Sequence, residues 1–123
     1  MILIADDSKF MRISLKRILQ EHGYSQFVEA ENGLQAVLLY RLVKPKLVFL
    51  DITMPVKNGL TALQEIKEMD RDAKVVICTS LSTEENKKRA YSLGAAAFIT
   101  KPHLEVVPSI AKKLYSNSGE RSL

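Results

Sequence analysis

The sequence predicts an α/β fold in which a doubly wound, five-stranded parallel sheet carries helices on both faces. Two observations lead to this prediction. Five short apolar runs alternate along the chain with longer segments of helical periodicity. The runs also lack the apolar and polar alternation of a half-exposed strand, which indicates strands covered on both sides. The chain has 123 residues, of which 46% are hydrophobic and 26% charged, so we expect one domain with its own core.

The apolar runs predict the strands. Each run has four or five residues, which is too short for a helix, and several are rich in β-branched side chains. The predicted strands span residues 1–5, 27–30, 47–50, 75–78 and 95–99.

The segments between the runs predict the helices, because apolar residues recur there every three or four positions. In the first helix Ser8 is the expected N-cap and Gly23 the stop, while Thr83 and Gly94 bound the fourth. Pro108 lies in the last segment, so we expect that helix to start late or to be kinked. The predicted helices span residues 8–22, 33–43, 60–69, 83–93 and 105–115, and the apolar repeat of the first is Phe10, Met11, Ser14, Leu15, Ile18 and Leu19.

Composition excludes several classes of protein. Cys78 is the only cysteine, so there is no internal disulfide or thiolate metal cluster, and we expect a small buried side chain. No apolar run approaches the roughly 18 residues of a membrane span, and no export signal precedes the first strand, so we expect a cytoplasmic protein. The formal net charge is +4. The basic clusters 87–89 and 112–113 lack interleaved aromatic residues, which indicates solvated helix surfaces and no nucleic-acid partner.

Polar residues follow four of the five strands. Asp6 and Asp7 follow the first strand, Asp51 the third, Thr79 the fourth and Lys101 the fifth. Ligand sites of parallel sheets form beyond the carboxyl ends of the strands. A flavodoxin-like strand order of 2-1-3-4-5 would bring these four ends together, with the second strand at the edge. We therefore expect one pocket there.

These residue types favour phosphoryl transfer. Three carboxylates in one pocket repel one another unless a cation screens them. Oxygen ligands without a nearby His or Cys favour a hard ion, above all Mg²⁺. A lysine opposite the acids suits an anionic phosphoryl group or the carboxylate that receives it. Asp6 and Asp7 by themselves could equally cap a helix, and the matching strand ends weigh against that interpretation.

Several motifs in a fixed order resemble a known family. Asp6-Asp7-Ser8, then Leu50 to Pro55 with Asn58-Gly59, then Thr79-Ser80, then Phe98 to Pro102 match the receiver domain of two-component response regulators. The resemblance covers residues 1–115, and residues 116–123 form a polar tail. Within the family the sequence is most similar to the stand-alone chemotaxis regulator. One departure is His103, where the family usually has Phe.

The resemblance implies a metal site and a phosphoacceptor. Asp51 would accept a phosphoryl group from the phosphohistidine of a sensor histidine kinase. Asp7 and Asp51 would hold Mg²⁺ together with the backbone carbonyl of Thr53, and Asp6 would act through water. The protein would then be a signalling module and not a turnover enzyme, since it would catalyse only its own phosphorylation and slow dephosphorylation.

The resemblance also implies a switch. Lys101 would pair with Asp51 and then with the phosphoryl group, and the bond from Lys101 to Pro102 would be cis. Thr79 would bind another phosphoryl oxygen, and Phe98 would change rotamer. The fourth helix, fifth strand and fifth helix would then present an altered surface to a phosphorylation-dependent target, either the flagellar motor or another effector, with a phosphatase as a further partner.

Three alternatives stay open at this point. The chain could be the receiver fragment of a larger regulator with a DNA-binding or catalytic effector. It could be a Mg²⁺-dependent phosphohydrolase with an aspartyl nucleophile, although such enzymes place the nucleophile on the first strand. It could also be a flavin carrier of the same fold, although the hydroxyl-rich loop that would bind the flavin phosphate is missing after the first strand.

Overall fold

The five predicted strands form one parallel sheet in the order β2-β1-β3-β4-β5, which confirms the predicted topology. They are seen in the computed structural model of the protein, which describes residues 1–116. The strands are β1 (Ile2–Ala5), β2 (Phe27–Ala30), β3 (Leu47–Leu50), β4 (Val75–Thr79) and β5 (Ala97–Thr100). Ala5 pairs with Leu50 across β1 and β3, so the next residues along the chain, Asp6 and Asp51, leave the sheet side by side.

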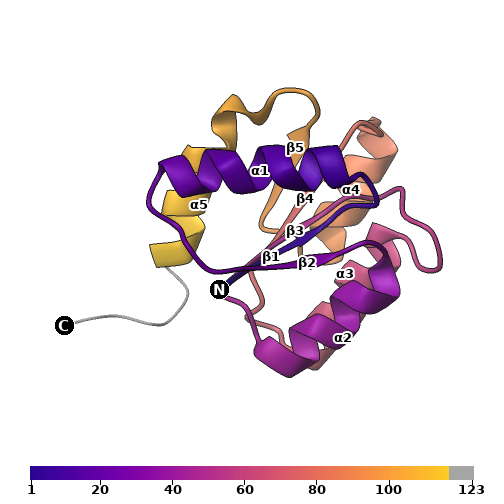
Figure 1. Ribbon diagram of the computed structural model, residues 1–123. Coiled ribbons are helices and arrows are strands. Elements are labelled where there is room, and N and C mark those ends of the chain that lie inside the picture. The colour runs from indigo at the N-terminus through magenta and orange to yellow at the C-terminus, as the bar shows by residue number, and fades with distance from the viewer. Residues whose placement is uncertain (117–123) are drawn as a thin grey trace.

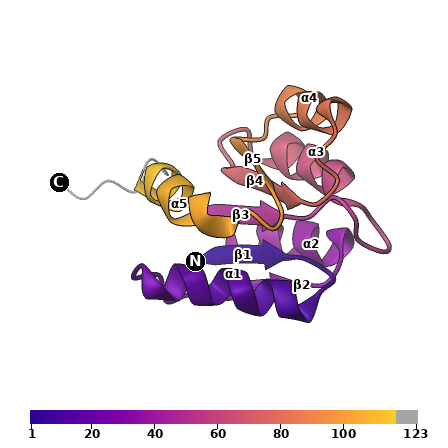
Figure 2. The ribbon, with the colours of Figure 1, turned by 90° about the horizontal axis from the view of Figure 1, so that it is seen from above.

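Helices cover both faces of the sheet (Figure 1). One face carries α1 and α5, and the other carries α2, α3 and α4, as the view from above also shows (Figure 2). The helices are α1 (Lys9–Glu21), α2 (Gly33–Val43), α3 (Gly59–Met69), α4 (Glu84–Ser92) and α5 (Val107–Ser116), with a short 3-10 helix, η1 (Leu104–Val106), before the last. None of the helices in residues 1–116 has the length and apolar character that a membrane span requires.

Each face of the sheet buries its own apolar cluster, because successive side chains of a strand point to opposite sides. From β1, Ile2 and Ile4 pack toward α1 and α5, together with Leu15 and Leu19. Leu3, the residue between them, packs toward α2 and α3. Cys78 is buried as predicted, and burial raises the pKa of its thiol to about 12. The thiol is therefore protonated and unreactive at neutral pH.

Polar N-caps fix four of the loops at the carboxyl edge of the sheet. The hydroxyl of Ser8 accepts a hydrogen bond from the Met11 amide at 3.2 Å, and that of Thr83 accepts one from Asn86 at 3.1 Å. Both caps are as predicted. Asn32 and Asn58 cap α2 and α3 in the same way. These bonds satisfy helix amides that would otherwise lack a partner, and they set where each helix begins.

The structure differs from the prediction at the start of β5, which is Ala97 and not residue 95. The Ala95 amide donates to the carbonyl of Ala90, and Gly94 has a φ of 102°. Because Ala95 takes part in this hydrogen-bonded, left-handed ending of α4, Ala95 cannot join the sheet. Similarly, β4 extends one residue further than predicted, to Thr79.

Two further outcomes concern the first and last helices. Phe10 belongs to the apolar repeat of α1, yet it is 73% exposed, while Arg12 is buried.

The last helix starts at Val107, which confirms the late start and places Pro108 in the first turn, where its missing N–H costs nothing. The predicted tail, residues 116–123, lies outside the described residues except for Ser116, which ends α5.

Candidate functional site

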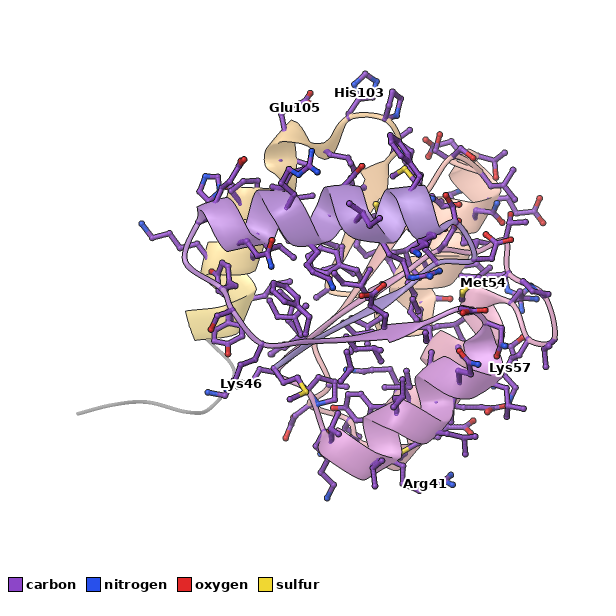
Figure 3. All side chains as sticks on the ribbon, in the orientation of Figure 1. Arg41, Lys46, Met54, Lys57, His103 and Glu105 are labelled. Carbon is purple, nitrogen blue, oxygen red and sulfur yellow. The ribbon has the colours of Figure 1, made fainter. Side chains whose placement is uncertain are left out.

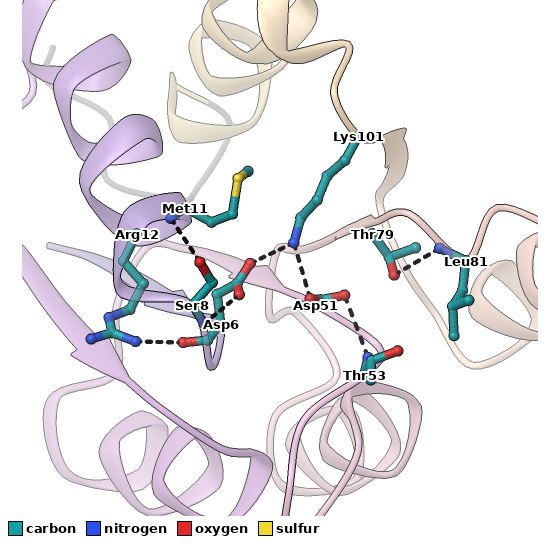
Figure 4. Close-up of polar contacts among 9 residues, drawn as sticks. All are labelled: Asp6, Ser8, Met11, Arg12, Asp51, Thr53, Thr79, Leu81 and Lys101. Carbon is teal, nitrogen blue, oxygen red and sulfur yellow. Dashed lines mark hydrogen bonds and ion pairs between the residues drawn. The ribbon is translucent and has the colours of Figure 1, made fainter.

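Two carboxylates share one lysine at the carboxyl edge of the sheet. Lys101 Nζ donates hydrogen bonds to Asp6 Oδ2 at 2.7 Å and to Asp51 Oδ2 at 3.0 Å (Figure 4). Asp6 is only 2% exposed and Asp51 only 7%. In a buried place a carboxylate needs a cation or hydrogen bonds to stay charged, and Lys101 supplies the charge for both.

The strands determine this arrangement. Asp6 follows β1 and Asp51 follows β3, and these two strands are direct neighbours in the sheet. Lys101 follows β5, which lies two strands away from β3, and its long side chain spans the distance across β4. The Lys101 amide donates to the carbonyl of Thr79 at 2.9 Å, which continues the pairing of β5 with β4. The peptide bond between Lys101 and Pro102 is cis, as the resemblance implied.

The lysine stays charged in this setting. Burial by itself would lower the pKa of Lys101, but the hydrogen bonds and charges of Asp6 and Asp51 outweigh it, so the pKa is raised above 10.5. One ammonium group therefore faces two carboxylates. The surplus negative charge makes the pocket suitable for a second cation.

The acidic cluster has the composition of a hard-ion site. Asp6, Asp7 and Asp51 each offer a carboxylate oxygen, and these oxygens lie within 4.8 Å of one another. Asp6 is held by two donors, since its Oδ1 accepts from the Ser8 amide at 2.9 Å and its Oδ2 from Lys101. Asp7 is exposed, and within residues 1–116 its side chain has no ion pair or hydrogen bond. Three carboxylates match the oxygen donors that Mg²⁺ prefers.

Thr79 and Thr53 border the same carboxylate. Figure 4 shows Thr79 on the opposite side of Asp51 from Asp6. Thr79 is fully buried, and its Oγ1 accepts a hydrogen bond from the Leu81 amide at 3.2 Å. The Thr53 amide donates to Asp51 Oδ1 at 3.4 Å, a long bond that leaves this oxygen available.

Phe98 does not lie with these polar side chains. It is half-buried and packs against the apolar cluster under α2, α3 and α4. Its strand neighbour on β4 is Ile77. The structure therefore places the predicted switch residue in β5, next to β4, and not in the pocket itself.

Gly59 allows the loop after β3 to close over the pocket. A Cβ at this position would lie 1.9 Å from the backbone oxygen of Asp51, so no other residue fits without moving the backbone that carries the carboxylate. The Gly59 amide also donates to the carbonyl of Ile52 at 2.9 Å. This glycine thus positions Asp51 through the close approach of two backbone segments.

Sequence reasoning missed a second charged network beside the acids. The buried Arg12 donates through Nη1 to the backbone carbonyl of Asp6 at 2.7 Å and through Nε to Glu29 Oε1 at 2.8 Å. Lys16 Nζ lies 2.6 Å from the other oxygen of Glu29. Hydrogen bonds from Lys16 and Arg12 lower the pKa of Glu29. The network fixes the backbone at Asp6. Glu29, a charged residue inside an apolar strand run, was the sequence signal that could have revealed this network.

An open cavity adjoins the pocket. It has a volume of about 400 Å³ and lies between the loop after β3 and the first turns of α3 and α4. Its lining includes Leu81 and Thr53, the residue whose amide donates to Asp51. His103, in contrast, is exposed, and its Nδ1 lies 3.8 Å from Glu105 (Figure 3).

Comparison with known proteins gives a consistent result. The family model of the response regulator receiver domain matches residues 2–109. The chemotaxis protein CheY of Halobacterium salinarum is 46% identical over 101 residues, which are 82% of this chain and 83% of that protein. CheY of Bacillus subtilis is also 46% identical, over 82% of this chain and 84% of its own length. A crystal structure of the CheX-CheY-BeF3-Mg²⁺ complex from Borrelia burgdorferi covers 91% of this chain and 87% of that chain, with a TM-score of 0.85 and 34% identity.

Proposed function

The chain belongs to the response regulator receiver domain family, and from that premise we propose that Asp51 accepts a phosphoryl group and thereby switches the binding of a partner protein. We place this receiver domain at residues 1–115. The observation that carries the proposal is the buried Asp51 carboxylate, which Lys101 holds at 3.0 Å beside a second acid. The phosphohydrolase alternative is not favoured, because the relatives are signalling proteins.

The phosphoryl donor is the phosphohistidine of a sensor histidine kinase. An oxygen of Asp51 attacks phosphorus, the bond from phosphorus to the imidazole nitrogen breaks, and an acyl phosphate forms on Asp51. Lys101 then faces the new phosphoryl oxygens with a fixed positive charge. The pocket supplies positioning and charge, so the protein modifies itself once and does not turn over a substrate.

The acidic cluster supports Mg²⁺ as the cofactor. Asp7 and Asp51 would hold the ion together with the backbone carbonyl of Thr53, while Asp6, whose oxygens Ser8 and Lys101 occupy, would act through water. When bound, the ion offsets the charge of the carboxylates and of the phosphoryl group. The free carboxylate of Asp7 is the ligand that this assignment depends on most.

The signal leaves the pocket through Thr79. Its hydroxyl now accepts a hydrogen bond from the Leu81 amide. If the hydroxyl turns to donate to a phosphoryl oxygen, the loop between β4 and α4 loses this bond and can move. Phe98 on the neighbouring strand β5 then changes rotamer into the space that Thr79 leaves. The surface of α4, β5 and α5 changes with it and is where the target binds.

The partners follow from the relatives. The stand-alone chemotaxis regulator is the role that the similarity to CheY supports, with the flagellar motor or another effector as the target. The Borrelia burgdorferi structure joins a CheY to CheX, which supports a protein partner for this chain as well. We infer that a phosphatase is a further partner and acts on Asp51 through the adjoining cavity. The chain would also fit as the receiver of a larger regulator.

Acetyl phosphate with Mg²⁺, followed by intact mass spectrometry, tests the proposal. The parent protein should gain one phosphoryl group, and Asp51→Asn should gain none. Asp72→Asn, an exposed aspartate away from the pocket, is the matched control and should behave as the parent. A phosphoryl group on the Asp51→Asn protein would show that Asp51 is not the acceptor.

A further inference from the structure

The outward side of α2 is apolar, which is unusual for a surface helix. Leu34, Leu38 and Leu42 are 41%, 50% and 78% exposed. The opposite side of the helix packs into the core and is formed by Gly33, Ala36, Val37 and Tyr40. Contiguous exposed apolar residues of this kind mark interaction sites on soluble proteins.

The three leucines form one continuous row. They are spaced by four residues, so they follow a single ridge of the helix and extend along about 12 Å of its length. In Figure 1, α2 lies at the outer edge of the molecule, with α3 and the sheet on its inner side. The row is therefore available to another molecule.

Opposite charges lie at the two ends of this row. Glu31 comes just before the helix, and Arg41 lies in its last turn. Both side chains are exposed, and Figure 3 shows Arg41 pointing away from the body of the protein. Within residues 1–116 neither side chain forms an ion pair. The surface thus consists of an apolar row with an exposed acid before its first leucine and the exposed bases Arg41 and Lys44 beside its last.

We propose that this surface binds the same surface of a second copy of the chain, with the two α2 helices antiparallel about a twofold axis. With Leu38 on the axis, Leu34 of one copy meets Leu42 of the other, and the reverse contact forms as well. Arg41 of each copy then lies one helical turn from Glu31 of the other. The helix dipoles are also antiparallel, which is favourable.

Charge explains why this pairing is antiparallel. A parallel arrangement would place Glu31 next to Glu31 and Arg41 next to Arg41, and like charges in contact are destabilising. The antiparallel arrangement instead places Arg41 of each copy opposite Gln35 and within one helical turn of Glu31 of the other copy. A patch whose charges are complementary to its own in this way can bind a second copy of the chain, and no other protein is needed to complement it.

The association is weak. Standard interfaces involve about 20–30 residues on each side, whereas α2 offers three leucines and the few charged residues around them. A dissociation constant on the order of 100 µM is the expected range for such a small contact. The pairing does not depend on the phosphorylation of Asp51, so the two proposals can fail separately.

Sedimentation velocity of the unphosphorylated protein, from about 10 µM to about 1 mM, tests the association by mass action. The weight-average mass should rise toward that of a dimer with concentration. Leu38→Asp should remove the rise, because it places two carboxylates on the twofold axis. Tyr91→Asp is the matched control, since Tyr91 is exposed to 51% but lies on α4, and it should dimerise as the parent does.

Charge reversal tests the geometry without removing a leucine. Glu31→Lys or Arg41→Glu alone should weaken the dimer severalfold, and the double variant should restore the affinity of the parent. A parent protein that stays monomeric at about 1 mM would overturn the proposal and point to a different protein as the occupant. Equal effects of Leu38→Asp and Tyr91→Asp, or no restoration in the double variant, would also overturn it.

Discussion

The molecule contains two very different buried polar contacts. At the carboxyl edge of the sheet, one Lys101 ammonium group serves both Asp6 and Asp51. Between α2 and the end of α3, the hydroxyl of Tyr40 donates one hydrogen bond of 2.7 Å to Asp70. The first contact joins two carboxylates to one cation, whereas in the second each oxygen of one carboxylate has its own donor, since Asp70 Oδ1 also accepts from the Asp72 amide at 3.0 Å.

This difference separates a functional site from a structural contact. A buried charge without full compensation lowers the stability of the fold. A protein retains such a charge where a bound ligand can later compensate it. A carboxylate whose two oxygens both have donors offers less for a ligand to bind. We therefore expect that substitutions at the carboxyl edge can raise stability while they destroy function, and that substitutions at Tyr40 and Asp70 can only lower stability.

The largest effect should come from Asp7→Ala. This change removes the one carboxylate of the cluster without a partner in residues 1–116 and so the most available ligand for Mg²⁺. Phosphorylation by acetyl phosphate with Mg²⁺ should slow by about 100-fold or more, since the charge of a bound metal contributes several kcal/mol. The free energy of unfolding should change by less than about 0.5 kcal/mol, as for other surface positions.

Single-turnover kinetics with intact mass detection would measure the rate, and urea denaturation would measure stability. Asp72→Ala removes an exposed aspartate elsewhere and serves as the control. Incorporation of phosphate by Asp7→Ala at the parent rate would show that the metal assignment is wrong.

Lys101→Met should have the next largest effect. It leaves two buried carboxylates without their cation, and we expect the free energy of unfolding to fall by about 2 kcal/mol without Mg²⁺. Adding Asp51→Asn to this variant should recover part of the loss, because one of the two uncompensated charges then disappears. Urea denaturation of the parent, both single variants and the double variant gives the coupling energy. Additive effects would show that Lys101 and Asp51 do not stabilise one another.

Tyr40→Phe should lower stability by about 1 kcal/mol, the usual contribution of one hydrogen bond. Burial and the hydrogen bond to Asp70 raise the pKa of Tyr40 above its usual 10.0. The stability linked to a raised pKa is present below the unfolded value and is lost as pH rises through the folded value. The parent should therefore lose stability above about pH 10, and Tyr40→Phe should lose less. Identical alkaline profiles of the two proteins would contradict this.

Much of the fold could be predicted from the sequence, because five apolar strands covered on both faces leave few other arrangements. The acids and Lys101 were also predictable, since each directly follows a strand and the strand order then places them together. What could not be predicted depends on side chains that cross between elements. The position of Arg12 on α1 gives no sign that it is buried against Glu29 on β2. The exposure of Phe10 likewise depends on how α1 is rotated on the sheet.

The smallest effect should come from Val56→Gly, in the loop that follows Asp51. Val56 has a φ of 69°, a left-handed conformation that is strained for a β-branched residue. It is the central residue of a tight turn in which the Lys57 amide donates to the Pro55 carbonyl at 2.7 Å, and its side chain is 76% exposed. Glycine would remove the strain with little loss of packing.

The gain from Val56→Gly is reduced because glycine has more conformational freedom in the unfolded chain. We expect a net rise of about 0.5 kcal/mol in the free energy of unfolding, measured in urea. Val56→Ala, which removes the branching but keeps the Cβ, should give less. The carboxyl edge would then be open to stabilisation at a position that touches neither carboxylate nor lysine, whereas we expect substitutions at the contact of Tyr40 with Asp70 only to lower stability. A lower stability of Val56→Gly would mean that the loop is not strained, and that the sharing of one lysine by two carboxylates alone distinguishes the two regions.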